Sequence, residues 1–440
     1  MTTATVFLSL SIALIAGLLL SRLAKLVHLP AVTAYLIAGI LIGPFLLGKL
    51  HIDGLGFTSL HQVEGFSMLC DLALGFIAFA IGNEFRMSQL KQIGKQATVI
   101  GVLQAVATTA LVDVVLIALH FAMPEILPLP VAIVLGAIAA ATAPAATLMV
   151  VKQYKAKGPV TTILLPIVAL DDAVGLVLFA ISFGVAKSIG AGNVSVLSVV
   201  LEPILEVVLS LLLGFIMGLL FNYMERFFHS RSKRLAVSVG FVMMTVAISS
   251  LTFTVGGIHI AFSSLLSCMM LGTVFCNICD FSEELMDRVD RWTAPLFILF
   301  FVLSGAELNL AVFSNWTIVL IGVVYILARS VGKYTGAFAS SKMMKCDPNI
   351  VKYLGITLLP QAGVALGMAS KAASTTTGIP GGDLIMNITL FAILIYEIVG
   401  PFLTKLSLTK AGEIKPEGKT SARHEHAMKM AAAKSNNEVK

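Results

Sequence analysis

The sequence predicts an all-α integral membrane protein with about thirteen transmembrane helices. Hydrophobic residues make up 58% of the chain and charged residues only 12%, about half the charged share of a soluble domain. Apolar segments of spanning length recur from end to end, and the loops between them are alternately basic and nearly uncharged. The net charge of +6 is spread over short loop clusters, which argues against a nucleic-acid-binding protein. No nucleophile–base constellation or metal motif stands out in the sequence, which argues against an enzyme.

The apolar periodicity places each predicted span in order along the chain. The spans cover residues 4–24, 30–49, 66–84, 97–120, 128–151, 160–186, 196–222, 235–253, 257–279, 293–306, 315–339, 350–372 and 383–405. The first span is expected to remain as a helix rather than be cleaved as a signal peptide, because Arg22 and Lys25 follow its apolar run.

The loop charges predict the orientation of the chain in the membrane. Lys and Arg gather in alternate loops, beginning with the loop of Arg22 and Lys25, while intervening loops such as "HIDGLGFTSLHQVEG" and "TFTVGGIH" hold none. By the positive-inside rule the N-terminus lies outside and the C-terminus in the cytoplasm, and we expect a bacterial plasma membrane. Residues 1–406 then form the transmembrane domain, and residues 407–440 form a polar cytoplasmic tail.

Two adjacent acids, Asp171 and Asp172, interrupt the sixth span near its middle. A charge at this depth costs several kcal/mol unless it is paired or hydrated, so such acids are candidates for an ion or proton site. A salt bridge that only fixes helix packing is the alternative. Because neighbouring side chains on a helix point about 100° apart, one acid can meet a basic partner while the other faces a cavity. An unpaired carboxylate takes either a proton or a cation, which is the minimal requirement of an exchanger.

The eleventh span offers two candidate basic partners, Arg329 and Lys333, on one helix face. Lys333 lies one turn nearer the cytoplasm, where snorkelling would account for it, whereas snorkelling does not easily account for Arg329 near mid-membrane. The fifth and twelfth spans are predicted to contain helix breaks at Pro144 and at Pro360 to Gly363. Thr142, Gln361 and the carbonyls freed by these breaks are expected to supply neutral oxygens to an alkali cation.

Several motifs resemble the monovalent cation:proton antiporter superfamily, in particular its second branch with a paired Asp-Asp. They are "LPAVTAYLIAGILIGP" (29–44), "FIAFAIGNEFRMSQLKQIGK" (76–95), "LDDAVGL" (170–176), "FFVLSGAELN" (300–309) and "ARSVGKYTGA" (328–337). Ala34 and Asn83 depart from the family pattern, and Thr142-Ala143-Pro144 lacks the additional Asp of some sodium exchangers. The resemblance covers nearly the whole chain except the tail.

The resemblance implies the antiporter fold, in which inverted repeats contribute two crossed broken helices. It implies a core at about 97–186 and 315–405 that moves against a scaffold at about 4–84 and 235–306, with a linker helix at about 196–222. A homodimer and an elevator-like alternation are also implied. Asp172 would be the main proton- and cation-binding acid, and Asp171 would assist it by pairing with Arg329, or otherwise with Lys333.

The expected function is secondary active exchange of Na⁺ or K⁺ for protons. The expected partners are these ions and membrane lipid, with no cofactor and no nucleic acid, and no ATP-binding loop is present in the sequence. A sodium-coupled organic-anion symporter of the same fold and a non-transporting ion-responsive sensor are the alternatives.

Overall fold

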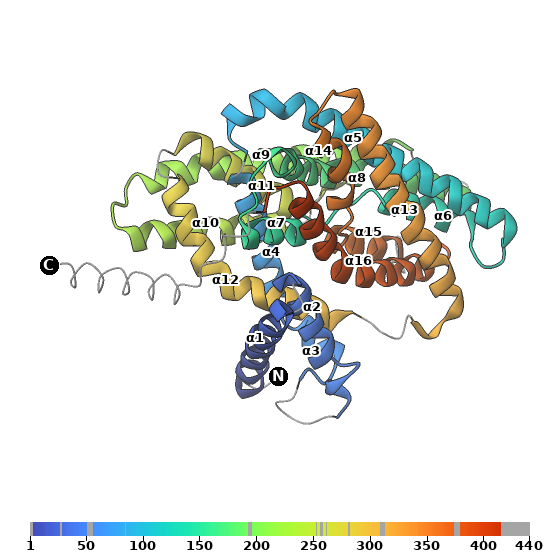
Figure 1. The fold of residues 1–440 in the computed structure, drawn as a ribbon, viewed down its shortest axis with the longest axis horizontal. Coiled ribbons are helices and arrows are strands. Elements are labelled where there is room, and N and C mark those ends of the chain that lie inside the picture. The colour runs from blue at the N-terminus through green and yellow to red at the C-terminus, as the bar shows by residue number, and fades with distance from the viewer. Residues whose placement is uncertain are drawn as a thin grey trace, which may run out of the picture.

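The chain folds into a bundle of α-helices (Figure 1). The computed structural model describes residues 3–26, 29–50, 56–83, 85–191, 196–251, 253–255, 258–260, 262–279, 282–308, 313–373 and 379–414. The helices are α1 (Thr3–Leu26), α2 (Ala31–Ile42), α3 (Leu60–Glu64), α4 (Ser67–Asn83), α5 (Met87–Ala122), α6 (Leu129–Ile138), α7 (Pro144–Tyr154), α8 (Pro159–Ala191), α9 (Val196–Glu225), α10 (Arg231–Ser249), α11 (Ser264–Ile278), α12 (Ser282–Glu307), α13 (Trp316–Met343), α14 (Pro348–Thr357), α15 (Gly363–Ala373) and α16 (Gly382–Lys410). A 3-10 helix η1 (Leu47–Leu50) follows α2, and strands β1 (Phe253–Val255) and β2 (Ile258–Ile260) form an antiparallel hairpin.

The helices confirm the predicted fold class and order of spans, since each predicted span corresponds to one helix, to a helix with a short 3-10 extension, or to one broken pair. Among the described residues, nine helices are long and apolar enough to cross a membrane, and four shorter apolar helices accompany them. Several boundaries were predicted wrongly, among them the start of α5, which lies at Met87 and not at residue 97. The ninth helix begins at Ser264, because residues 258–260 pair in the hairpin. The tenth begins at Ser282, because its charged first turns hide it from a hydropathy reading, and the last continues to Lys410. Of the polar tail, residues 415–440 lie outside the described residues.

Two spans are interrupted in their middle, as the sequence predicts. The fifth divides into α6 and α7 between Ile138 and Pro144, and the twelfth divides into α14 and α15 between Thr357 and Gly363. Pro144 is the first residue of α7, a position where its missing amide hydrogen removes no helical hydrogen bond. The two breaks meet, because the Ala143 amide donates to the Pro360 carbonyl over 2.8 Å. We call residues 139–143 and 358–362 together the crossover.

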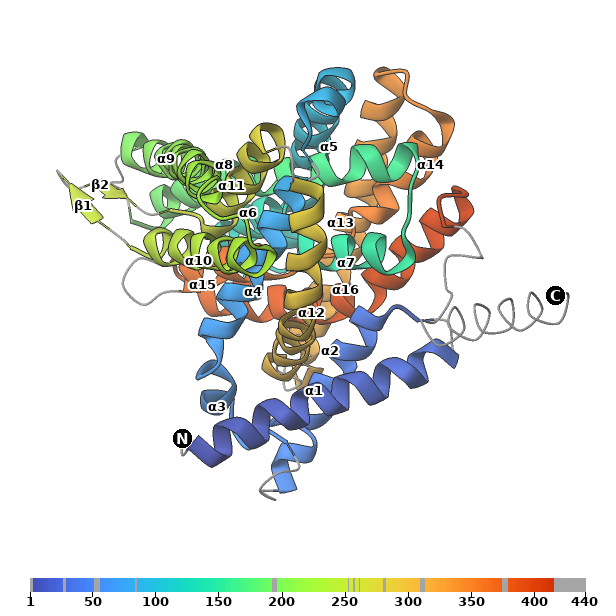
Figure 2. The same ribbon diagram turned by 90° about the vertical axis from the view of Figure 1, so that its left-hand side faces the viewer.

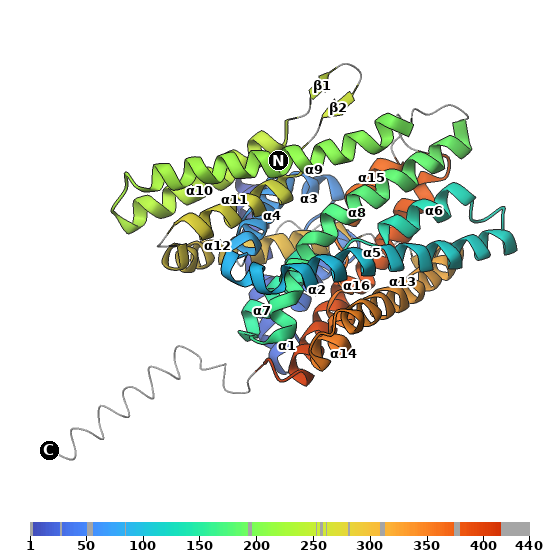
Figure 3. The same ribbon diagram turned by 90° about the horizontal axis from the view of Figure 1, so that it is seen from above.

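The helices pack as two groups. One buried cluster joins α1, α2, α4 and α9 to α12, and it also takes in small side chains of α7 and α8. Two further clusters join α5 to α8 with α13 to α16. Figures 2 and 3 show α9 and α10 on one side of the molecule and α13 and α14 on the other. Within the first group α2 packs closely on α12, because a Cβ on Gly39 would lie only 2.0 Å from the Val302 carbonyl oxygen.

The start of α8 is attached to the end of α16. The Glu413 carboxylate accepts hydrogen bonds from the amides of Val160 at 2.6 Å and Thr161 at 2.8 Å, and from the Thr161 hydroxyl at 2.5 Å. These amides have no partner within the helix, and the positive end of the helix dipole favours a carboxylate there. This contact fixes the N-terminal end of the helix that carries Asp171 and Asp172.

Candidate functional site

Asp171 lies at the centre of a buried polar cluster. Its side chain is completely buried, and its Oδ1 accepts a hydrogen bond from the side-chain amide of Gln104 on α5. Its Oδ2 accepts from the Thr142 hydroxyl at 2.6 Å and from the Lys333 ammonium at 2.9 Å. Three donors aimed at one carboxylate are what a negative charge needs when it is removed from water. Asp171 is therefore fully engaged by the protein.

The basic partner of Asp171 is Lys333, which corrects the sequence-based preference for Arg329. The Lys333–Asp171 ion pair is buried on both sides. The Lys333 ammonium also donates to the Ala140 carbonyl at 2.6 Å and to the Thr142 hydroxyl at 2.9 Å. Three donors on one compact cation match the three acceptors around it. An Arg partner would keep its proton at all times, whereas a buried Lys can release it. With Lys333 in this position, the basic partner is itself able to carry a proton.

Arg329 instead binds the crossover. Its guanidinium donates to the carbonyls of Ala139 at 3.0 Å, Ala141 at 2.7 Å and Leu359 at 2.7 Å. It also lies 4.4 Å from the centre of the Tyr396 ring, a cation–π contact. The carbonyls at the ends of α6 and α14 lack helical partners and carry partial negative charge, and a planar group with five donors reaches several of them at once. Arg329 thus connects the two broken helices.

Arg329→Gln is expected to lower the melting temperature of the purified protein in detergent. The shorter, neutral side chain leaves crossover carbonyls buried without donors, and each such group costs about 1–3 kcal/mol. Intrinsic fluorescence during heating measures the change. Arg291→Gln is the matched control, because the Arg291 side chain is 82% exposed and its loss should leave the melting temperature unchanged. Equal melting temperatures for the two variants would refute the assigned role.

Asp172 has a different environment from its neighbour. Its side chain is only 1% exposed, and neither carboxylate oxygen has a hydrogen-bond partner among the described residues. The ammonium of Lys333, whose charge favours the ionised form of Asp172, is already bonded to Asp171. The structure therefore places Asp171, which accepts three hydrogen bonds, beside Asp172, which accepts none from the described residues. A buried carboxylate without donors requires a proton or a cation to neutralise it.

The neutral oxygens expected around the ion are mostly bound by protein donors. Arg329 and Lys333 hold the carbonyls of residues 139–141 and 359, and the Ala143 amide holds that of Pro360. The Thr142 hydroxyl lies between Lys333 and Asp171. The sequence-based expectation of free carbonyls is thus wrong for these groups. Gln361 differs, because its amide nitrogen donates to the Ile138 carbonyl and the Tyr325 hydroxyl, both at 3.0 Å, while its Oε1 has no partner among the described atoms.

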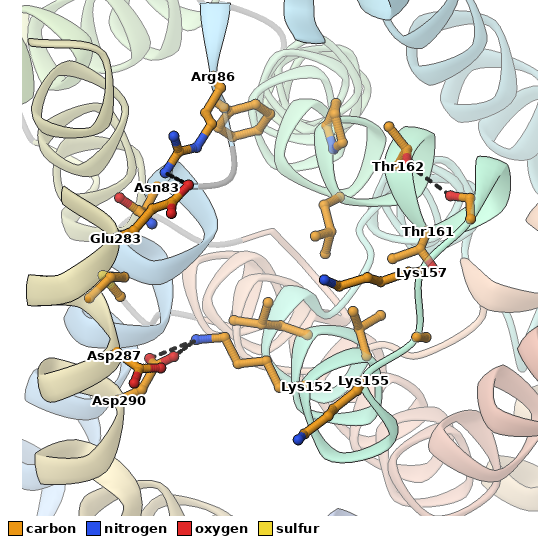
Figure 4. Close-up of a pocket in the computed structure, with 18 residues that line it drawn as sticks. Asn83, Arg86, Lys152, Lys155, Lys157, Thr161, Thr162, Glu283, Asp287 and Asp290 are labelled. Atoms are coloured by element: carbon orange, nitrogen blue, oxygen red, sulfur yellow. Dashed lines mark hydrogen bonds and ion pairs between the residues drawn. The ribbon is translucent and has the colours of Figure 1, made fainter. Parts of the chain in front are cut away.

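A cavity of about 790 Å³ approaches this site from one side of the protein (Figure 4). It opens between α7 and α8 on one wall and α4 and α12 on the other. Two ion pairs lie at its mouth, Lys152–Asp290 at 2.7 Å and Arg86–Glu283 at 3.0 Å. The lining residues of α8 that come nearest to Asp172 along the helix are Leu165 and Pro166, and Leu165 precedes Asp172 by about two helical turns, or roughly 10 Å. The cavity therefore ends short of the buried acids.

Comparison with known proteins identifies the family. The family model described as "Sodium/hydrogen exchanger, transmembrane" matches residues 10–410. The chain belongs to the sodium/hydrogen exchanger family. This exchanger is accordingly a multi-pass membrane protein of the monovalent cation:proton antiporter superfamily, as its motifs predict.

Individual relatives of the exchanger are distant but cover most of it. The Na(+)/H(+) antiporter NhaS4 of Synechocystis sp. (strain PCC 6803) is 23% identical over 365 residues, which span 80% of this chain and 84% of NhaS4. A structure of the sodium proton antiporter MjNhaP1 from Methanocaldococcus jannaschii at pH 8 superposes with a TM-score of 0.64 and 20% identity, covering 92% of this chain and 95% of that one. An electron-microscopy structure of MjNhaP1 gives a TM-score of 0.70 and 19% identity, covering 96% and 100%. These structures share the exchanger's fold.

Gln104 is the site residue of the exchanger that sequence reasoning missed. It is completely buried on α5, and its amide nitrogen donates both to Asp171 and to the Gly101 carbonyl at 3.0 Å. A signal was present, because Gln104 is the one amide side chain in the predicted span 97–120, and buried amides in membranes form hydrogen bonds with polar partners. Asp171 and Asp172 gave a stronger signal, because burying a charged side chain in a bilayer costs more free energy than burying an amide.

Proposed function

We propose that this exchanger binds a proton and a monovalent cation alternately at Asp172 and so moves them in opposite directions across the membrane. The carrying observation is that Asp172 is buried with both carboxylate oxygens unengaged. A buried ion without a partner costs several kcal/mol, so one of the two ligands neutralises Asp172 at nearly all times. Because both neutralise the same charge, each displaces the other, and exchange is coupled.

The surrounding residues have distinct parts in this proposal. Lys333 and Thr142 keep Asp171 engaged, so that the second acid does not draw the ion away from Asp172. Gln361 offers its free Oε1 as a neutral ligand for the cation. Arg329, with Pro144, Pro360 and Gly363 at the breaks, fixes the shape of the crossover. Asp172 and Asp171 together then form the monovalent-cation site, with Asp172 as the ligand.

Movement of one helix group against the other would expose Asp172 to each side in turn. We assign residues 97–186 and 315–405 to a moving core, 4–84 and 235–306 to a scaffold, and 196–222 to a linker helix. The buried clusters support this division in part, because two of them hold mainly core residues while the third joins the scaffold helices and takes in only α7, α8 and neighbouring crossover residues from the core. The cavity lies along their boundary and leads toward Asp172, which is the arrangement that an elevator-like alternation needs. A homodimer formed through the scaffold would hold that part still.

The cavity is assigned to the cytoplasmic face. Its mouth carries Arg86, Lys152, Lys155 and Lys157, which belong to the basic loops that the positive-inside rule places inside. The N-terminus then lies outside and the C-terminal tail lies in the cytoplasm, in a bacterial plasma membrane. The structure in this reading is open toward the cytoplasm, with the ion site itself closed.

Reconstituted vesicles test the function. A pH-sensitive dye inside sealed vesicles should report proton movement when Na⁺ is added outside, because NhaS4 and MjNhaP1 are named as sodium antiporters. K⁺ and Li⁺ are added in parallel to determine the cation preference. Proton movement with none of the three cations would contradict the proposal. Sodium-dependent uptake of an organic anion without proton counterflow would favour the symporter instead.

A further inference from the structure

Gln104 binds the oxygen of Asp171 that the basic partner leaves open. The Oδ2 atom of Asp171 accepts hydrogen bonds from Thr142 at 2.6 Å and from Lys333 at 2.9 Å, whereas Oδ1 accepts from the side-chain amide of Gln104. All four side chains are buried. One oxygen of the carboxylate is thus held by a hydroxyl and a cation, and the other by a neutral amide that does not titrate.

Close packing between α5 and α13 holds Gln104 in place. A Cβ on Gly336 would lie 3.0 Å from the Gln104 Cα, and a Cβ on Gly332 would lie 3.0 Å from the Thr108 Cα. The Thr108 hydroxyl donates to the Gln104 carbonyl over 2.6 Å. Glycine at such positions lets two helices approach closely in a membrane, and Lys333 directly follows Gly332 in the sequence. The same helix contact therefore brings Gln104 and Lys333 to the two oxygens of one carboxylate.

The Gln104 amide satisfies its contacts in a single orientation. Its Nε2 donates both to Asp171 Oδ1 and, at 3.0 Å, to the Gly101 carbonyl. An amide nitrogen has two hydrogens, so these two contacts use both of them. If the nitrogen and oxygen were exchanged, the Gln104 oxygen would face two acceptors that have no hydrogen to donate. The observed arrangement therefore requires Asp171 Oδ1 to be without a proton.

The two adjacent acids consequently offer a proton very different sites. A proton on Asp171 Oδ1 would point at an N–H group, and turning the amide to accept it would break the Gly101 contact. Its Oδ2 is already occupied by the donors Thr142 and Lys333. Asp172 lies next in the chain, and both of its oxygens lack donors among the described residues. A proton or a cation that reaches the pair therefore displaces no hydrogen bond at Asp172.

The charged groups around Asp171 lie on two helices. Lys333 on α13 is its ion-pair partner, Asp172 is its neighbour on α8, and Arg329 on α13 is bound to crossover carbonyls. Helix α6 carries no charged residue. In the described part of the chain, α8 and the other helices that pack against it also carry Lys187 on α8, Lys95 and Asp113 on α5, Lys152 on α7, Glu206 and Glu225 on α9, Lys352 on α14 and Lys371 on α15. None of these is among the groups whose charge acts on Asp171.

We propose that Gln104 is a positioning residue of the exchange site, which keeps Asp171 ionised so that Asp172 alone takes the transported proton or cation. This inference rests on the proposed exchange function. Without the Gln104 amide, Asp171 Oδ1 has no donor from α5 and resembles the open oxygens of Asp172, so both acids compete for protons. Gln104 therefore determines that one cation is opposed by one proton at the pair.

Gln104→Met tests this role, because methionine keeps the length of the side chain but has no donor. Reconstituted vesicles give the KM for whichever of Na⁺, K⁺ and Li⁺ is transported best, at a series of acidic pH values. Competition with one proton raises KM about tenfold for each pH unit lowered, and competition with two protons raises it toward about a hundredfold. The wild type should follow the first relation. Gln104→Met should show a steeper dependence, which a purely structural role of Gln104 would not produce.

Gln96→Met is the matched control. Gln96 is another amide on α5, and its Nε2 donates to the Met344 carbonyl at 3.5 Å rather than to an acid, so its loss should leave the pH dependence of KM unchanged. If Gln104→Met does not fold, Gln104→Asn carries the test, because its shorter side chain keeps an amide that falls short of Asp171. A wild-type pH dependence in the Gln104 variants would overturn the inference, as would an equal change in Gln96→Met. Wild-type vesicles without cation-dependent proton flux would refute the exchange function itself, a separate outcome.

Discussion

Asp172→Asn is expected to reduce cation-dependent proton movement to the rate of empty vesicles. The amide has nearly the shape of the carboxylate, but it cannot bind a proton at physiological pH or neutralise a cation. Because neither Asp172 oxygen is bonded to the protein, the substitution breaks no contact and removes a buried charge that is costly when unoccupied. The variant should therefore melt at the same temperature as the wild type or above it. Dye-loaded vesicles measure the first effect, and fluorescence-detected melting in detergent measures the second.

Asp171→Asn provides the comparison for this experiment. Asp171 accepts three hydrogen bonds and holds Lys333, so its replacement should lower the melting temperature, in contrast to Asp172→Asn. Measurable exchange by the Asp172→Asn protein would remove the basis of the proposed mechanism. A loss of stability equal to that of Asp171→Asn would show that Asp172 has partners which the structure does not give it.

Lys333→Gln is expected to produce the largest loss of stability. It leaves Asp171 completely buried without its cation, and removing one member of a buried ion pair typically costs about 3–5 kcal/mol. Exchange should fall as well, because an unpaired Asp171 competes with Asp172 for the ion. Chemical or thermal denaturation in detergent measures the stability, and the vesicle assay measures exchange.

The double variant Asp171→Asn/Lys333→Gln tests whether the pair acts as a unit. If it does, the double variant should be more stable than Lys333→Gln alone, because no charge then remains unpaired. Lys342→Gln, at an exposed position near the end of the same helix, is the matched control and should change neither property. Strictly additive losses in the double variant would argue against the ion pair.

The features that the sequence predicts correctly depend on local chemistry. Pro144 and Pro360 prevent regular helix wherever they are placed within a span, so both breaks could be located before the fold was known. Asp171 and Asp172 stand out in an apolar run because a charge there needs a specific environment. Their adjacency also implied that they point in different directions, and the structure indeed engages one and not the other.

The features that the sequence predicts wrongly depend on the relative placement of helices. Arg329 and Lys333 share one face of α13, and helical spacing does not reveal which of them lies level with Asp171. The choice is determined by the crossover. Its carbonyls, which lack helical partners, accept hydrogen bonds from the Arg329 guanidinium, and the Lys333 ammonium forms the ion pair with Asp171. The start of α12 was missed for another reason, because its first turns carry Glu283, Glu284 and Asp287 and resemble a loop in composition.

The crowding of donors at the crossover has a consequence for ion choice. The carbonyls of residues 139–141, 359 and 360 are held by Arg329, Lys333 and Ala143. In the proposed site, a metal ion bound to Asp172 and Gln361 Oε1 would therefore complete its coordination shell with solvent molecules. A coordination shell completed by water can adjust its size, so the site does not select an ion by matching its radius to a fixed ring of oxygens. Discrimination between alkali ions then depends on how much hydration each gives up to approach a single carboxylate.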